Sequence, residues 1–103
     1  MTEIKIAVKD NNAILLRAID LVAGTVGQKG VLYCDDNWSV YNKTISYKVG
    51  TTVLGTYKID SNTFTIPAQI LATAGLPLEI GITGRSTDNS IIIPTKWCYI
   101  GMI

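Results

Sequence analysis

Apolar and polar residues alternate along Thr44–Pro67, the clearest pattern in the chain. Apolar side chains and one glycine occupy the odd positions of 45–49 and 53–59, and after the turn-forming residues 60–62 they occupy even positions. Successive side chains of a β-strand point to opposite faces, so this pattern predicts three half-buried strands. Their shared inner face is predicted to consist of Ile45, Tyr47, Val49, Val53, Tyr57, Ile59, Phe64 and Ile66.

The second turn of this segment favours an antiparallel pairing of neighbouring strands. If Ile59 faces Phe64, then Tyr57 faces Ile66, and all four side chains lie on one side. The change from odd to even positions therefore fits a connection with an even number of residues. The sequence predicts a three-stranded antiparallel meander whose apolar face needs a second layer to cover it.

The first turn requires a different register. Opposing Val49 to Thr52 would set apolar against polar residues along the ladder, whereas opposing Val49 to Val53 keeps one face apolar. The second register also places Tyr47 over Gly55. We therefore predict an odd-length loop or a β-bulge at Gly50-Thr51-Thr52.

The same alternation predicts strands elsewhere in the chain. They are Ile4–Lys9, Ile14–Leu21, Val31–Cys34, Leu78–Thr83 and the C-terminal run Trp97–Ile103. Over Ala13–Val22 a helix is the alternative, because Asn12 suits an N-cap and five apolar residues also have helical spacing: Ile14, Leu15, Ala18, Ile19 and Val22. We favour the strand, because every unambiguous element around it is a strand.

Two prolines mark further boundaries. Pro67 suits the first position of a helix and Gly75 suits the residue after its end, so a short helix is predicted near 67–74. Pro94 follows three isoleucines and has no N–H to donate, so an edge strand or a break is predicted there. The polar residues 84–89 are predicted to form a hairpin loop.

About eight short strands with turn residues between them are typical of an all-β fold. We predict a two-layer antiparallel β-sandwich, immunoglobulin-like, as a single domain over residues 1–103. A true immunoglobulin disulfide between Cys34 and Cys98 is not expected. Trp38 follows Cys34 too closely, and Lys96 stands where that fold has a tyrosine. Two free thiols are expected instead.

Composition narrows the function. Charged residues make up 17% of the chain, below the roughly 25% usual for globular domains, so we expect a partner to cover part of the surface. The chain has no histidine, which removes the commonest general base and most zinc sites. A net charge of +1 with scattered basic residues argues against nucleic acid. Neither a membrane span nor a signal peptide is expected, so synthesis in the cytoplasm is the default.

Few residues suggest a site. Asp35-Asp36-Asn37 could bind calcium, but a solvated turn is the simpler interpretation. Trp38 and Tyr41 could form an aromatic platform for sugar, and the alternative is that Trp38 covers the end of the core. We therefore predict no catalytic residue, no metal ligand and no cofactor. The C-terminal run could be a central strand buried on both faces or a surface that pairs with another protein.

A loose family resemblance rests on the order of short segments. They are Asp36-Asn37-Trp38, Asn42-Lys43-Thr44, Thr65-Ile66-Pro67-Ala68-Gln69-Ile70-Leu71, Ile80-Gly81-Ile82-Thr83-Gly84 and Ile93-Pro94-Thr95-Lys96-Trp97. This order resembles small tail, baseplate and fibre proteins of phages and prophages of Gram-positive bacteria, above all the N-terminal β-sandwich module of baseplate upper proteins.

The resemblance implies a non-enzymatic structural protein that is made in the host cytoplasm and resides in the virion. It also implies a homo-oligomer of three- or six-fold symmetry in contact with other virion proteins, without nucleic acid or membrane as a partner. The alternative function is a binding module for host-surface glycan, which would use Trp38, Tyr41 or the loop Gly84–Asn89.

Overall fold

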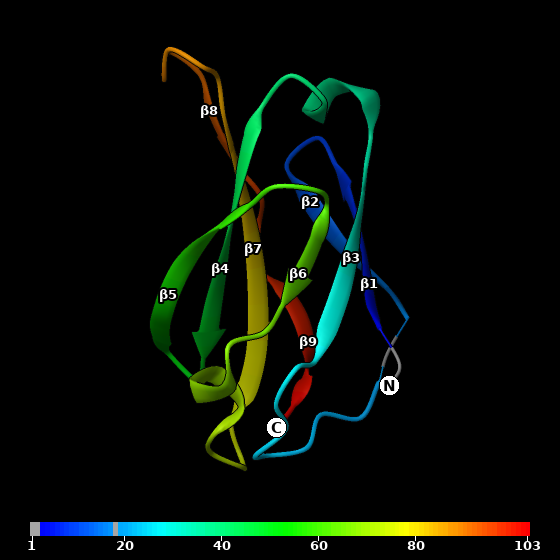
Figure 1. Ribbon diagram of the computed structural model, residues 1–103, viewed down its shortest axis with the longest axis vertical. Helices are drawn as coiled ribbons and strands as arrows, with labels where there is room; N and C mark the ends of the chain where they lie inside the picture. The colour runs from blue at the N-terminus through cyan, green and yellow to red at the C-terminus, as the bar shows by residue number, and fades with distance from the viewer. Residues whose placement is uncertain (1–2, 18) are drawn as a thin grey trace.

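The computed structural model describes residues 3–17 and 19–103, which form two facing β-sheets (Figure 1). The first sheet has the order β2 (Asn12–Arg17), β1 (Ile4–Lys9), β3 (Lys29–Cys34) and β6 (Thr63–Thr65). The second contains β5 (Thr52–Ile59), β4 (Asn42–Val49), β7 (Pro77–Arg85), β8 (Ile92–Pro94) and β9 (Cys98–Met102). Two short 3₁₀ turns, η1 (Asp36–Trp38) and η2 (Ala68–Leu71), lie between strands. The predicted all-β sandwich is confirmed.

One continuous hydrophobic core lies between the sheets. The alternate residues of β1, Ile4, Ile6 and Val8, are at most 1% exposed, as are the inward residues of β7, Leu78, Ile80 and Ile82. This pattern is what the period of two along each strand dictates. The sheet of β1 is mixed rather than purely antiparallel as predicted, because β1 and β3 run parallel, whereas the β1–β2 and β3–β6 pairs are antiparallel.

The predicted three-stranded meander is wrong in its third strand. β4 and β5 pair as predicted, with Ile45 opposite Tyr57. β6, however, leaves this sheet and pairs with β3 of the other, where Phe64 faces Gly30. From its place in the facing sheet, β6 still points the even position Phe64 into the core. The odd-to-even switch after residues 60–62 therefore fits either a turn within one sheet or a crossing to the facing sheet. The pattern alone does not distinguish the two.

The first turn combines a correct and an incorrect expectation. Tyr47 lies opposite Gly55 as predicted, but Val49 pairs with Thr52 and Lys48 with Val53. The register shifts between these pairs, which makes Leu54 the extra residue of a β-bulge. The bulge thus lies beyond the predicted 50–52, and Val53, predicted to be inside, is 53% exposed. The two-residue turn before this bulge is Gly50-Thr51, and Gly50, at φ +62°, allows it to be tight.

Other elements are close to their predicted positions. β1 has the predicted bounds, and the ambiguous segment is a strand that ends at Arg17, with irregular backbone from residue 19 to 28. The predicted strand to Leu21 is therefore too long, and Ala18 lies outside the described residues. In place of a helix over 67–74 there is only the single turn η2, which buries Ile70 and Leu71. β7 continues to Arg85 and β8 begins at Ile92, so the hairpin loop lies at 86–91, two residues later than predicted.

The C-terminal run forms an edge rather than a centre. β8 and β9 pair with successive parts of β7 along the same side, which confirms the predicted edge position of Pro94. Cys98 and Ile100 point into the core, whereas Tyr99 and Met102 are about half exposed. Burial of this run on both faces is therefore excluded.

Candidate functional site

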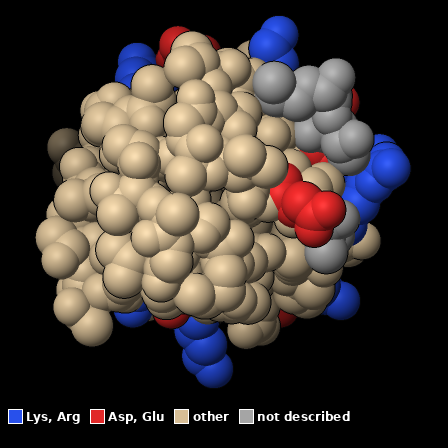
Figure 2. Space-filling view, turned by 90° about the horizontal axis from the view of Figure 1, so that it is seen from below, with Lys and Arg blue, Asp and Glu red and all other residues tan. Residues whose placement is uncertain are grey.

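The end of the sandwich seen in Figure 2 is almost free of charge. We call it the uncharged end, and it consists of residues 21–28, 50–54, 66–77 and 101–103, which contain no Lys, Arg, Asp or Glu. In Figure 2 a broad surface of uncharged residues fills most of the view, with basic side chains at its margin and an acidic side chain on the right-hand part of the face. Charge is instead carried by the sides of the sandwich and by the opposite end, where η1 and the β7–β8 turn lie (Figure 1).

Backbone hydrogen bonds hold the segments of the uncharged end together. The N–H of Gly24 donates to the carbonyl of Leu71 at 2.8 Å, and that of Ile66 donates to Gln28 at 2.8 Å. The N–H of Gly75 donates to the carbonyl of Ile103 at 2.8 Å. These bonds link the loop after β2, the η2 region and the C-terminal strand. The surface is therefore a fixed shape that would lose little conformational entropy on binding.

Large apolar side chains project from this end. Val22, Val26 and Leu76 are 63%, 72% and 40% exposed. Val53, Leu54 and Met102 continue the exposed apolar surface from β5 and β9. Single exposed apolar residues are normal on a soluble protein, whereas an uncharged group of them at one end is a less common surface feature.

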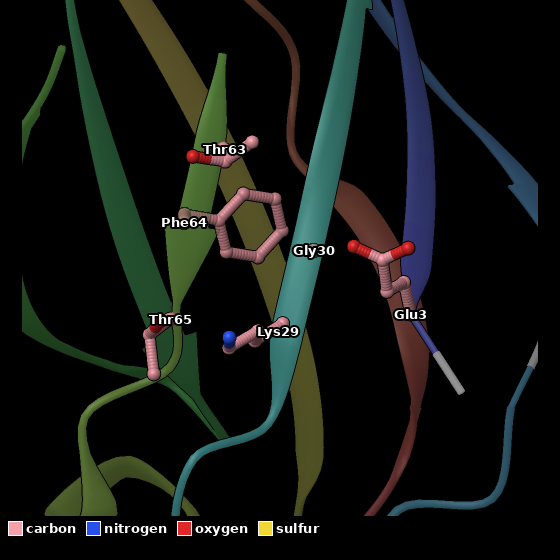
Figure 3. A pocket seen from close by; sticks show the side chains of 6 residues that line it. All are labelled: Glu3, Lys29, Gly30, Thr63, Phe64 and Thr65. Atoms are coloured by element: carbon pink, nitrogen blue, oxygen red, sulfur yellow. The ribbon is translucent and has the colours of Figure 1, made fainter. Parts of the chain in front are cut away.

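A hollow with a volume of about 330 Å³ lies over β3 and β6 (Figure 3). Its lining includes the Glu3 carboxylate, the Lys29 amine and the hydroxyls of Thr63 and Thr65. The ring of Phe64 lies across Gly30 and occupies the place that a side chain there would need. The lining has one carboxylate, so it lacks the pair that glycoside hydrolysis requires.

The aromatic platform suggested from the sequence is not at the surface. Trp38 is 1% exposed, its indole N–H donates to the carbonyl of Asp10 at 3.0 Å, and its ring lies over Gly84. Tyr41 packs edge-on against it with ring centroids 6.3 Å apart. Trp38 therefore closes one end of the core, as the alternative interpretation held, and the sugar platform at these two residues is wrong.

The acidic turn takes part in the local structure. Asp36 begins η1, and an oxygen of Asp35 accepts a hydrogen bond from the N–H of Asp10 at 3.3 Å. Residues 3–17 and 19–103 contain no group of three His, Cys, Asp or Glu side chains that could hold a metal ion. The calcium alternative for this turn thus has no support among the residues that the structure describes.

The two cysteines are free thiols, as predicted. Burial raises the pKa of Cys98, and likewise that of Cys34, above the ordinary value of 9.0. Both side chains therefore stay protonated at neutral pH, whereas a nucleophilic cysteine needs a lowered pKa.

Sequence reasoning did not identify the candidate surface. Val26 and Leu76 lie in loops without periodicity, and Val22 has helical spacing only in the alternative interpretation of its segment, so no pattern groups the three. The available signal was the absence of charge over 21–28 and 66–77, two stretches far apart in the sequence. Only the fold shows that they meet.

Fold and surface together define a class: a small all-β sandwich with one uncharged, apolar end. No protein-family model, curated protein or solved structure matches the chain. Among the described residues, no helix has the length and apolar character needed to cross a membrane.

Proposed function

We propose that this chain is a non-enzymatic structural protein that works by assembly with copies of itself and with neighbouring proteins. The observation that carries the proposal is the uncharged end. Its four segments are of the size that a specific interface uses, on the order of 20–30 residues a side. Apolar side chains on a rigid surface of this kind favour association, because their contact removes area from water.

A second copy is the partner that this surface suits best. A surface without charge meets its own copy without like-charge repulsion, whereas a surface of one sign would repel itself. The resemblance to baseplate upper proteins supports a place in the tail, baseplate or fibre of a phage virion, with three- or six-fold symmetry. Detection of the protein by mass spectrometry in phage particles induced from a strain that carries the gene tests the virion location.

Sedimentation of the purified protein over a range of concentrations tests the assembly. We expect the wild type to self-associate and Val26→Lys to raise the dissociation constant by roughly tenfold or more, because the new charge would have to leave water. Val40→Lys is the matched control, since Val40 has the same 72% exposure but follows η1 at the opposite end. A wild type that remains monomeric at every concentration would contradict the proposal, as would equal effects of the two substitutions.

A further inference from the structure

The outer face of the second sheet carries a smaller hollow, of about 180 Å³, that neither the core nor the uncharged end accounts for. β4 contributes Ser46, β7 contributes Gly81 and Thr83, and the connection from β8 to β9 contributes Thr95 and Trp97. Gly81 has no side chain on this face of the sheet, and the Trp97 ring lies in the space that one would need.

The Trp97 ring is held in place beside this hollow. Atoms Cε3 and Cζ3 of its indole lie 3.2 Å from the position that a Cβ of Gly81 would occupy. The Lys48 ammonium lies 5.0 Å from the ring centroid and pairs with Glu79 at 3.2 Å. Lys48 and Glu79 face each other on one side of Gly81 along the sheet, and Thr83 lies on the other. The ring therefore stands between the ion pair and the hollow.

The polar groups of the hollow are all neutral. The Thr95 hydroxyl oxygen accepts a hydrogen bond from the N–H of Ile82 at 3.0 Å, which leaves its own O–H to donate. The hydroxyl of Ser46 shares a hydrogen bond with that of Thr56 at 2.9 Å and keeps further accepting capacity. The lining thus presents hydroxyls, an aromatic ring and the apolar Ile82 and Pro94, and the Lys48 ammonium beside the ring is paired with Glu79.

We infer that this hollow binds one neutral pyranose ring. A sugar ring has an apolar face of C–H groups that packs on an aromatic ring, and hydroxyls at its edge that exchange hydrogen bonds with serine and threonine. An anionic ligand would find no unpaired cation in the lining, and a large apolar ligand would leave the hydroxyls without partners. The inference does not depend on the proposed assembly, because the hollow lies on the face of the sheet and not at the uncharged end.

Tryptophan fluorescence provides a direct test, because the chain has two tryptophans and only Trp97 is exposed. The probes are the methyl glycosides of glucose, galactose, mannose and N-acetylglucosamine. We expect at least one to change the emission of Trp97 saturably and to protect it from acrylamide quenching, with a dissociation constant on the order of millimolar for a single ring in a shallow site. No saturable change with any of the four probes would overturn the inference.

Two substitutions separate the hollow from the rest of the face. Trp97→Ala should weaken binding roughly tenfold or more. Because this variant lacks the indole whose fluorescence reports binding, its affinity is measured from NMR chemical shifts instead. Tyr99→Ala, which removes an exposed aromatic ring outside the lining, should leave binding unchanged. If Trp97→Ala fails to fold, Thr83→Val is tested instead, because it removes a hydroxyl from the lining while keeping the side chain's shape. This variant should also bind more weakly than the wild type. Wild-type affinity in a folded Trp97→Ala or in Thr83→Val would also overturn the inference.

Discussion

Glycines determine where the aromatic rings of this protein lie. Gly84 leaves room for Trp38, Gly30 for Phe64 and Gly81 for Trp97, and a Cβ at any of the three would crowd the ring. In the first two pairs the ring fills the core, and in the third it stands at the surface. Sequence reasoning could place Trp38 in the core but could not pair it with Gly84, because the two residues are 46 positions apart.

At the residue scale, Asp88 provides a test by pH. Hydrogen bonds from the Ser90 hydroxyl and N–H and from the Ser86 hydroxyl lower its pKa from 3.8 to about 2. Because the folded pKa lies below the unfolded one, the carboxylate stabilises the turn above pH 3.8, and this contribution is lost as the pH falls through about 2. We expect an NMR titration to give this pKa, and Ser90→Ala to move it back towards 3.8. An unchanged pKa in Ser90→Ala would mean that the hydrogen bonds are not its cause.

At the element scale, alternation predicted strand positions better than strand partners. β1 and the β4–β5 hairpin could be placed from the period of two, because each has a polar and an apolar face. The pairing partner of β6 could not be predicted in this way. The switch from odd to even inward positions fits a turn within one sheet, but it also fits the observed crossing to the other sheet. The bulge at Leu54 was inferred from the sequence but misplaced, since Gly50 permits a tighter turn than the apolar ladder suggested.

The face assignment within β5 can be tested with two neighbouring residues. The Tyr57 ring packs on Tyr47, with centroids 5.8 Å apart, and its hydroxyl accepts a hydrogen bond from Gln69 at 3.1 Å. Tyr57→Asp should therefore lower the free energy of unfolding by about 2–4 kcal/mol, because a carboxylate would lie against an aromatic ring. Lys58→Asp should change it by less than about 1 kcal/mol, since Lys58 is exposed and its ion pair with Asp60 is a surface one. Urea denaturation measures both, and equal losses would show that β5 is turned differently.

At the scale of the whole molecule, the distribution of charged residues over the surface indicates where a partner could bind, whereas their total number does not. The low charged fraction led to the expectation of a covered surface, but it could not say where that surface lies. The fold brings 21–28 and 66–77 together through the hydrogen bonds from Gly24 to Leu71 and from Ile66 to Gln28. Those contacts depend on the path of irregular loops, which no periodic pattern encodes.

Salt provides the test that belongs to this scale. An interface formed by charged groups weakens as salt screens their attraction, whereas apolar contact is not screened. If copies meet through the uncharged end, raising sodium chloride should leave the dissociation constant of self-association within about twofold, and sodium sulfate should lower it by strengthening apolar burial. Sedimentation in both salts measures the two effects. Dissociation by sodium chloride alone would instead place the interface on the charged sides or the opposite end, even if the protein does assemble.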